Sequence, residues 1–407
     1  MTENNAIRLS TSRTGTGMPD QPCGPQLHLS TRAVQATAER QTPQPAIQPA
    51  STVFFDTVET LHEAEANPFD VFFYGGMGTP AVSRIETAVA QLELGERAIL
   101  VSSGSAAVTA ALIAFARAGQ HLLVADTVAS STRRFCETVL RGLGVEIEFY
   151  DPAAGADIAR LLRPGTCAVY MESPGSLSLE MQDVPAIAAA ARSHGVITIL
   201  DNSWGAFGAF RPFEHGVDVV VVSLGKQAAG HADLMLGALV TSHRHAARLK
   251  DIAVQLGHVP GALESYLALR GLRSLPLRGE RQLRTTIELG RWFAARADVR
   301  RVLCPALPGA PGHELWRRDC RSAAGLLTIA FAAEARDDVI AAINRLALSR
   351  LGFGWGGAES LVLPILEPPP RQFAKQPADE FWVRLSTGLE EAADLIADWS
   401  RALDGDA

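Results

Sequence analysis

Short apolar runs alternate with helical patterns through the middle of the chain. Runs too short and too rich in β-branched residues for helices predict strands at 98–101, 121–125, 145–150, 167–171, 196–200 and 219–222. Apolar residues at helical spacing predict a helix at 84–94, an alanine-rich segment predicts one at 106–116, and the alternation with strands predicts further helices at 131–143, 156–162 and 184–193. Strands and helices in turn are typical of an α/β fold whose mostly parallel sheet is covered on both faces.

The pattern changes after residue 240. Helical segments at 261–269 and 278–295 come first, and strands follow near 322–331 and 383–385, which predicts a smaller C-terminal α/β domain. The first 26 residues are rich in Thr, Ser, Gly and Pro without an apolar period, so we expect them to be disordered. We therefore divide the chain into a disordered tail, an N-terminal arm, a large domain and a small domain, at 1–26, 27–77, 78–270 and 271–407.

Two predicted strands end in residues that carry chemistry. The run at 219–222 leads into Ser223 and Lys226, and the run at 196–200 leads into Asp201. Ligands of open α/β sheets gather at the carboxyl ends of the strands. An amine and a carboxylate at that edge suit a pyridoxal phosphate enzyme, since the lysine forms a Schiff base and the acid keeps the pyridinium nitrogen protonated. The alternative is a lysine that ends a strand and an aspartate that opens a turn.

A second candidate site lies where the strand at 98–101 meets the next helix. The turn between them contains Gly104 and Ser105, and an alanine-rich helix follows. Free N–H groups and the helix dipole would point at one spot there, which favours an anion such as phosphate. Close packing of small residues is the alternative explanation.

Several separate motifs resemble those of one enzyme family. They are YGGMGTP at 74–80, SSGSAAV at 102–108, MESPGSLSLEMQDVPAI at 171–187, ILDNSWGAFG at 199–208, SLGKQAAGHAD at 223–233, PALPGAPGHELWRRD at 305–319, GWGGAESL at 354–361 and VRLSTGLE at 383–390. From about 74 to 395 the chain resembles the Cys/Met-metabolism family of fold-type I pyridoxal phosphate enzymes, and within it the cystathionine β-lyases. The resemblance implies a fold-type I transferase fold, with a mostly parallel seven-stranded sheet in the large domain.

The resemblance also implies how the cofactor would be held. Lys226 matches the residue that attaches pyridoxal 5'-phosphate and later carries the proton, and Asp201 matches the partner of the pyridinium nitrogen. Tyr74 matches a tyrosine that reaches the phosphate from the neighbouring subunit. The remaining phosphate ligands implied are Gly104, Ser105 and Ser223.

Three further residues match positions that contact the substrate in the family. Arg384 matches the arginine that holds the α-carboxylate by two parallel hydrogen bonds. From the residues alone, Arg384 could equally form an ordinary surface ion pair. Trp355 and Ser176 match positions that line the substrate pocket.

Five positions depart from the family pattern. Gly76 occupies a position where the family has an arginine that binds the phosphate from the partner subunit. Ala129 occupies a position where the family has a tyrosine that stacks on the cofactor ring. The other three stand for a threonine, a serine and a larger aromatic residue, at Gly225, Gly354 and Ala358. Every change removes bulk or a polar group, so we expect a pocket widened for a substrate larger than cystathionine.

Composition narrows the function further. The 407 residues are 47% hydrophobic and 20% charged with a net charge of −7, which predicts a soluble globular protein without a nucleic-acid partner. No apolar run could span a membrane, the N-terminus has no hydrophobic signal core, and the scattered cysteines predict no metal site, so we expect a cytoplasmic protein.

The function that these observations favour is a pyridoxal phosphate lyase. We expect it to act on a sulfur-containing or otherwise β- or γ-substituted amino acid, as a homodimer or homotetramer with shared active sites. A β/γ-replacement or carbon–carbon bond-forming enzyme of specialised biosynthesis is the first alternative. A non-catalytic relative that only binds the cofactor is the second.

Overall fold

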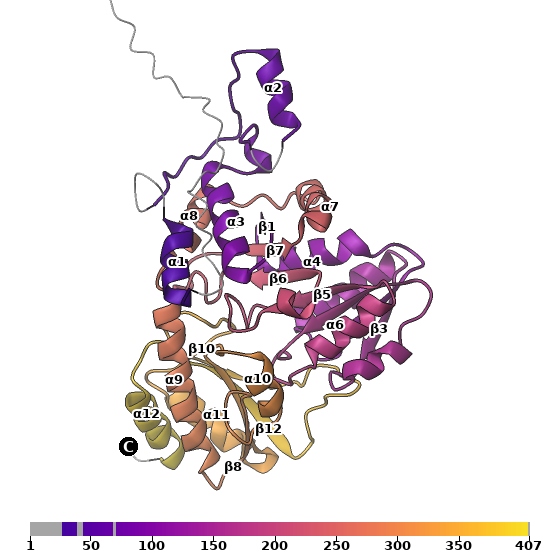
Figure 1. The fold of residues 1–407 in the computed structure, drawn as a ribbon. Helices are drawn as coiled ribbons and strands as arrows, with labels where there is room; N and C mark the ends of the chain where they lie inside the picture. The colour runs from indigo at the N-terminus through magenta and orange to yellow at the C-terminus, as the bar shows by residue number, and fades with distance from the viewer. Residues whose placement is uncertain (1–26, 39–43, 68–70, 406–407) are drawn as a thin grey trace, which may run out of the picture.

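A seven-stranded sheet forms the centre of the fold (Figure 1). The computed structural model describes residues 27–38, 44–67 and 71–405, so the predicted disordered tail lies outside the described residues. The strands of the seven-stranded sheet lie in the order β1 (Arg97–Val101), β7 (Gly237–Thr241), β6 (Val219–Ser223), β5 (Ile197–Asp201), β4 (Thr166–Glu172), β2 (His121–Ala125) and β3 (Glu146–Tyr150). Only β7 runs antiparallel to its neighbours within this sheet, so the predicted α/β fold with a mostly parallel sheet is confirmed.

Helices cover this sheet on both faces. Strands β2 and β6 are buried along nearly their whole length, which explains their unbroken apolar runs. The helices packed on or beside the sheet are α3 (Pro80–Glu93), α4 (Gly104–Phe115), α6 (Val184–Ser193), α7 (His243–Gln255) and α8 (Ala262–Leu272). Helix α4 begins two residues earlier than expected, because the Ser103 hydroxyl caps it by accepting the N–H of Ala106.

Two predicted helices take other forms. The segment predicted at 131–143 consists of α5 (Ser130–Arg134) followed by a π-helical stretch at Phe135–Leu140. The segment predicted at 156–162 is a 3₁₀ helix at Gly155–Arg160. Pro152 and Pro164 lie on either side of the 3₁₀ helix and leave too short a stretch for a regular α-helix.

A five-stranded sheet forms the C-terminal half of the molecule. Its order is β10 (Arg350–Leu351), β11 (Leu361–Pro364), β12 (Glu380–Ser386), β9 (Leu326–Ala332) and β8 (Val299–Leu303). The helices of this half are α9 (Leu275–Ala294), α10 (His313–Asp319), α11 (Arg336–Arg345) and α12 (Ala392–Asp404). Phe293 of α9 packs edge-to-face on Phe331 of β9 and on Trp399 of α12, which fixes both helices against the sheet.

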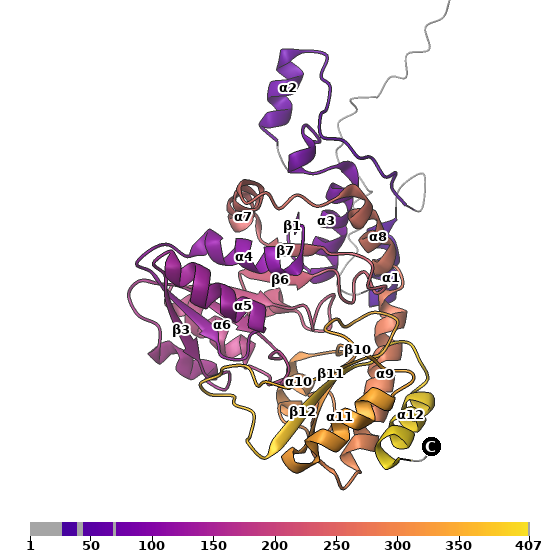
Figure 2. The same ribbon diagram turned by 180° about the vertical axis from the view of Figure 1, so that it is seen from behind.

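The N-terminal segment has two different parts. Helix α1 (Leu29–Thr37) packs on α3, and its Arg32 side chain donates hydrogen bonds to the carbonyls of Gln91 and Leu92. The first part of the arm predicted at 27–77 is therefore a helix packed on the body, because its buried alanines fit closely against α3. Helix α2 (Val58–Glu65) projects away from both sheets (Figures 1 and 2).

None of the helices within 27–38, 44–67 and 71–405 is long and apolar enough to cross a membrane.

Candidate active site

Parallel strands β5 and β6 place Asp201 and Lys226 at one edge of the large sheet. Asp201 ends β5 and pairs in register with Val221 of β6, and Lys226 follows the end of β6 by three residues. The loop that carries the lysine is closed by hydrogen bonds from the Gly230 N–H to the Lys226 carbonyl and from the Ala229 N–H to the Leu224 carbonyl. The amine and the carboxylate that the sequence predicts at one edge are therefore neighbours, and each influences the ionisation of the other.

The surroundings of Lys226 favour its neutral form. Burial lowers the pKa of its amine, the nearby Arg384 guanidinium lowers it further, and Asp201 opposes both. The amine lies 5.8 Å from the centre of the Trp355 ring. An amine that loses its proton easily can attack an aldehyde and can accept a proton from carbon, which are the two tasks expected of this lysine.

Asp201 is a half-buried acid at the end of β5. Burial raises the pKa of its carboxyl, whereas hydrogen bonds from Ser203 and the charge of Lys226 lower it. The Ser203 N–H donates to Oδ1 at 2.9 Å. A protonated ring nitrogen against this carboxylate would offset the cost of its burial.

Glu172 is a second acid at this edge, and the sequence interpretation missed it. It ends β4 directly beside Asp201, and its Oε2 accepts the N–H of Ala129 at 2.7 Å. Burial and the neighbouring Asp201 raise the pKa of Glu172 to about 8, against the Ala129 N–H and the charge of Arg371. The rule that identified Asp201, an acid directly after a buried strand, would have found it.

This raised pKa predicts a pH dependence of stability. Between pH 4.5 and about 8 the folded chain keeps a proton on Glu172 that the unfolded chain releases, so stability falls as pH rises. Glu172→Gln should flatten this fall in melting temperature between pH 6 and 8, although Glu93, whose burial raises its pKa to about 7, keeps part of the slope. Thermal unfolding at pH 6 and pH 8 measures this fall in melting temperature, and Glu314→Gln, a substitution of an exposed glutamate, is the control. An equal slope in wild type and Glu172→Gln would contradict the prediction.

The predicted phosphate ligands meet at the start of α4. The N–H groups of Gly104 and Ser105 precede the first backbone hydrogen bond of the helix, from the Ala107 N–H to the Ser103 carbonyl. A Cβ added at Gly104 would lie 2.6 Å from the Ser223 hydroxyl oxygen, so only glycine lets β6 approach the turn this closely. Tyr74 does not belong to this group. It lies in the N-terminal arm, where its backbone forms an isolated antiparallel β-bridge with Thr52, and it is 53% exposed.

These residues fit pyridoxal phosphate. The turn supplies N–H and hydroxyl donors and a helix N-terminus for a phosphate. Asp201 supplies a buried carboxylate for a cationic ring nitrogen, and Lys226 supplies an amine of lowered pKa for the aldehyde. The three groups follow β1, β6 and β5 at one edge of the sheet, and antiparallel β7 lies between β1 and β6.

Arg384 brings a buried guanidinium to the same place from β12. Its Nη2 donates to the carbonyls of Phe353 and Gly354 at 2.8 and 3.0 Å, and its Nε has no partner within the described ranges. Burial lowers the pKa of Arg384 to about 10, so it stays charged at neutral pH. No carboxylate of the described chain pairs with it, so the alternative of a surface ion pair is wrong, and an anionic ligand would complete its coordination.

The remaining two predicted residues lie on loops, and only Trp355 is shown beside Lys226. Trp355 precedes Gly356, whose φ is +83° and whose Cβ position would lie only 2.7 Å from the backbone nitrogen of Gln227. This close approach holds the tryptophan against the lysine loop. Ser176 lies beyond the end of β4, and its N–H donates to the carbonyl of Thr127 at 2.8 Å.

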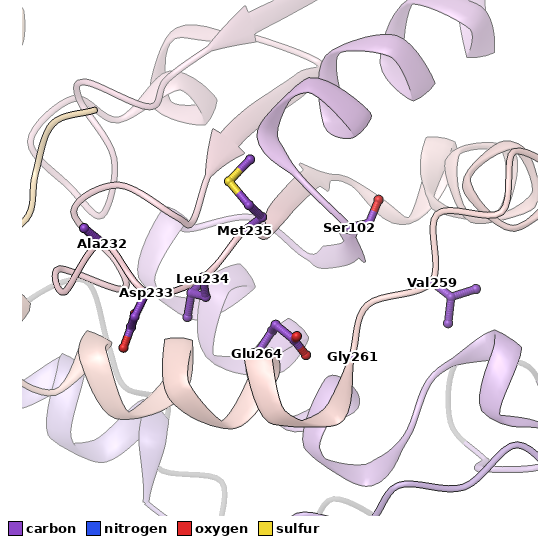
Figure 3. A pocket seen from close by; sticks show the side chains of 8 residues that line it. All are labelled: Ser102, Ala232, Asp233, Leu234, Met235, Val259, Gly261 and Glu264. Carbon is purple, nitrogen blue, oxygen red and sulfur yellow. The ribbon is translucent and has the colours of Figure 1, made fainter. Parts of the chain in front are cut away.

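An open cavity of about 570 Å³ borders the phosphate turn (Figure 3). Its walls come from Ser102, from the segment before β7 with Asp233 and Met235, and from the approach to α8 with Val259 and Glu264. It contains none of the predicted substrate residues. Met235 is 68% exposed, so the cavity has an apolar rim that this chain leaves uncovered.

Comparison with known proteins agrees with this geometry. The model of the family "Cys/Met metabolism PLP-dependent enzyme" matches residues 29–404. A putative cystathionine beta-lyase of Rhizobium johnstonii is 40% identical, covering 88% of this chain and 90% of the relative, and cystathionine beta-lyase MetC of Escherichia coli is 36% identical, covering 86% and 91%. The crystal structure of metB from Corynebacterium glutamicum shares the fold, with a TM-score of 0.86 at 24% identity, covering 93% and 98%. The chain therefore belongs to the Cys/Met metabolism family of pyridoxal phosphate-dependent enzymes.

Proposed function

We propose that this enzyme is a lyase that cleaves the bond between the β- or γ-carbon of an amino acid and its substituent, in most substrates a sulfur. The supporting observation is that the Lys226 amine lies close enough to the Asp201 carboxylate and the Arg384 guanidinium for both to act on its pKa. Burial and Arg384 lower this pKa, and Asp201 raises it. The relatives that are 40% and 36% identical over the aligned residues are a putative cystathionine beta-lyase and cystathionine beta-lyase MetC. The expected compartment is the cytoplasm.

Each side chain has one task in this proposal. Arg384 binds the α-carboxylate and so fixes the α-carbon near Lys226, which removes the α-proton. Pyridoxal phosphate, when bound, takes up the electron pair left on the α-carbon. Asp201 keeps the ring nitrogen protonated, and the Trp355 ring keeps water from the amine.

The active site would be completed by a second copy of the chain. The arm leaves Phe54 94% and Val58 75% exposed, and the cavity beside the phosphate turn has an open apolar rim. Exposed apolar groups on a projecting segment are typical of a subunit interface. We propose a homodimer, or a tetramer of such dimers, in which the partner's arm brings its Tyr74 to the phosphate of this chain. The division into arm, large domain and small domain at 77 and 270 remains part of this proposal.

The glycines that depart from the family pattern differ in the space around them. A Cβ added at Gly76 would lie 2.5 Å from the Tyr74 ring, and one added at Gly225 would lie 2.8 Å from the Leu234 carbonyl. At Gly354, however, the nearest atom would be a methyl group of Leu361 at 3.6 Å, which is ordinary contact. We propose that the pocket is widened at Gly354, whereas neighbouring groups already fill the space at the other two.

Gly354→Ser tests this directly. The serine fits without moving the backbone and narrows the pocket beside Arg384. We expect kcat/KM for bulky S-substituted cysteines to fall about tenfold, the effect of about 1.4 kcal/mol, with little change for cystathionine. Steady-state kinetics on both substrates measure it, and Gly225→Ser serves as a control that should lower stability instead. An equal effect on both substrates would contradict a widened pocket at this position.

Ala129 narrows the choice of leaving group. Its backbone N–H binds Glu172, and its methyl group can neither stack on a ring as the family tyrosine does nor donate a proton. A substrate whose leaving group departs without protonation, such as a sulfonium that releases a neutral thioether or a sulfoxide that releases a sulfenate, therefore suits this site better than one that releases a plain thiolate.

A product assay tests the proposed function. The holoenzyme is incubated with cystathionine and with S-substituted cysteines and homocysteines of increasing size. Release of ammonia with pyruvate or 2-oxobutyrate supports elimination, and faster turnover of the bulkier substrates supports the widened pocket. A coupled amino-acid product would identify a replacement enzyme instead, and no turnover of any substrate would favour a non-catalytic relative.

A further inference from the structure

The loop between β11 and β12 binds the strand ends of the large sheet. The N–H groups of Gln372 and Phe373 donate to Oδ2 of Asp126, at 2.8 and 2.7 Å, directly after the end of β2. Asp126 is completely buried, and its other carboxylate oxygen pairs with Arg133. Both halves of the molecule are thus tied together at the edge where the candidate active site lies.

Arg371 extends this connection to the loop that carries Ser176. One of its terminal nitrogens donates to the Ser176 carbonyl and the other to the Ser178 hydroxyl. Arg371 is 8% exposed, and its Nε has no partner in the part of the chain that the structure describes. A guanidinium that is buried and bound to a loop carbonyl fixes that loop more rigidly than a lysine could, because its fork holds two acceptors at set angles.

The same loop is connected to the rest of the site. The Ser176 N–H donates to Thr127, so the segment after β4 and the segment after β2 move together. Ala129 follows two residues later and binds Glu172 through its N–H. Arg371 therefore holds the segment that carries Ser176, and it does so from a loop that carries none of the predicted site residues.

We propose that Arg371 is a positioning residue that sets substrate affinity by holding the Ser176 loop at the mouth of the site. The proposal rests on the proposed function only in assigning Ser176 to the substrate pocket. The nearby carboxylates of Glu180 and Asp126 balance its charge, so the guanidinium orients the loop and does not itself bind the substrate.

Arg371→Lys is the direct test, because lysine keeps the buried charge but loses the fork. The probe is L-norleucine, an unbranched amino acid without a leaving group, and its dissociation constant is read from the absorption of the holoenzyme. We expect this constant, and KM for cystathionine, to rise about tenfold, which corresponds to one lost charged hydrogen bond, while kcat changes less than about threefold. Melting temperature and bound cofactor should stay near wild type.

Three further variants keep the test decisive. Ser178→Ala removes one acceptor of the same guanidinium and should weaken norleucine binding less than Arg371→Lys does. The variant that carries both substitutions should bind norleucine no more weakly than Arg371→Lys alone. Arg296→Lys makes the same exchange beyond the end of α9, where the arginine binds Asp298 and Asp404. This control should leave the norleucine dissociation constant, KM and kcat unchanged.

An unchanged norleucine constant in Arg371→Lys, or in Ser178→Ala if the first variant does not fold, would overturn the proposal. So would a loss of activity fully explained by loss of bound cofactor. Norleucine binding does not depend on elimination. A holoenzyme that binds norleucine but releases no oxo acid from any substrate would refute the proposed function and still test the role of Arg371.

Discussion

Lys226→Ala is expected to reduce turnover by roughly 10³- to 10⁴-fold, the combined loss of a nucleophile and a general base. No other amine can take its place, because the chain contains only two further lysines, Lys250 and Lys375. Lys250 is held by Glu86 and the Met77 carbonyl, and Lys375 lies on the exposed surface. The variant should still fold, since shortening a partly buried side chain of lowered pKa removes a costly charge.

Borohydride reduction gives a readout that does not depend on turnover. Reduction fixes the cofactor on the lysine that carries it, so the mass shift of a proteolytic peptide should map to Lys226 in wild type and disappear in Lys226→Ala. Lys375→Ala, the matched control, should retain both the mass shift and full activity. A labelled peptide containing Lys250 or Lys375 instead would remove the basis of the proposed mechanism.

The sheet edge could be predicted because it depends on local sequence. A buried strand followed by a charged residue is visible in one short window, which is why Asp201 and Lys226 were placed correctly next to each other. The turn at Gly104 was visible for the same reason. Glu172 obeys the identical rule, because it directly follows the buried run at 167–171 and pairs in register with Asp201.

Contacts between distant segments were not predictable in this way. Arg371 follows three prolines in a stretch that indicates only a surface loop, yet it is buried against a loop almost two hundred residues earlier in the chain. Likewise, nothing near Arg384 in sequence shows that its partners are the carbonyls of 353 and 354. Such pairings follow from how the two sheets pack on each other, which a pattern along one strand does not contain.

Replacing Arg384 by methionine should raise the dissociation constant for norleucine and KM for cystathionine by about 100-fold or more. A paired, charge-assisted hydrogen bond to a carboxylate contributes about 1.5–3 kcal/mol per bond, and methionine keeps only the apolar length of the side chain. The dissociation constant and KM of Arg384→Lys should lie between those of the wild type and those of Arg384→Met, because lysine supplies the charge without the forked pair of donors. Arg300→Met, an exposed exchange on β8 of the same sheet, is the control.

A second readout separates substrate binding from mere loosening of the loop at 352–354. The Arg384 guanidinium lowers the pKa of Lys226, so its removal should move the acid limb of the kcat profile to higher pH, because the lysine then keeps its proton longer. A loosened loop alone would lower the melting temperature and leave that limb in place. Weak norleucine binding together with an unshifted limb would mean that Arg384 binds the carboxylate from a position too far away to influence the lysine, and the shared electrostatics proposed for this site would be wrong.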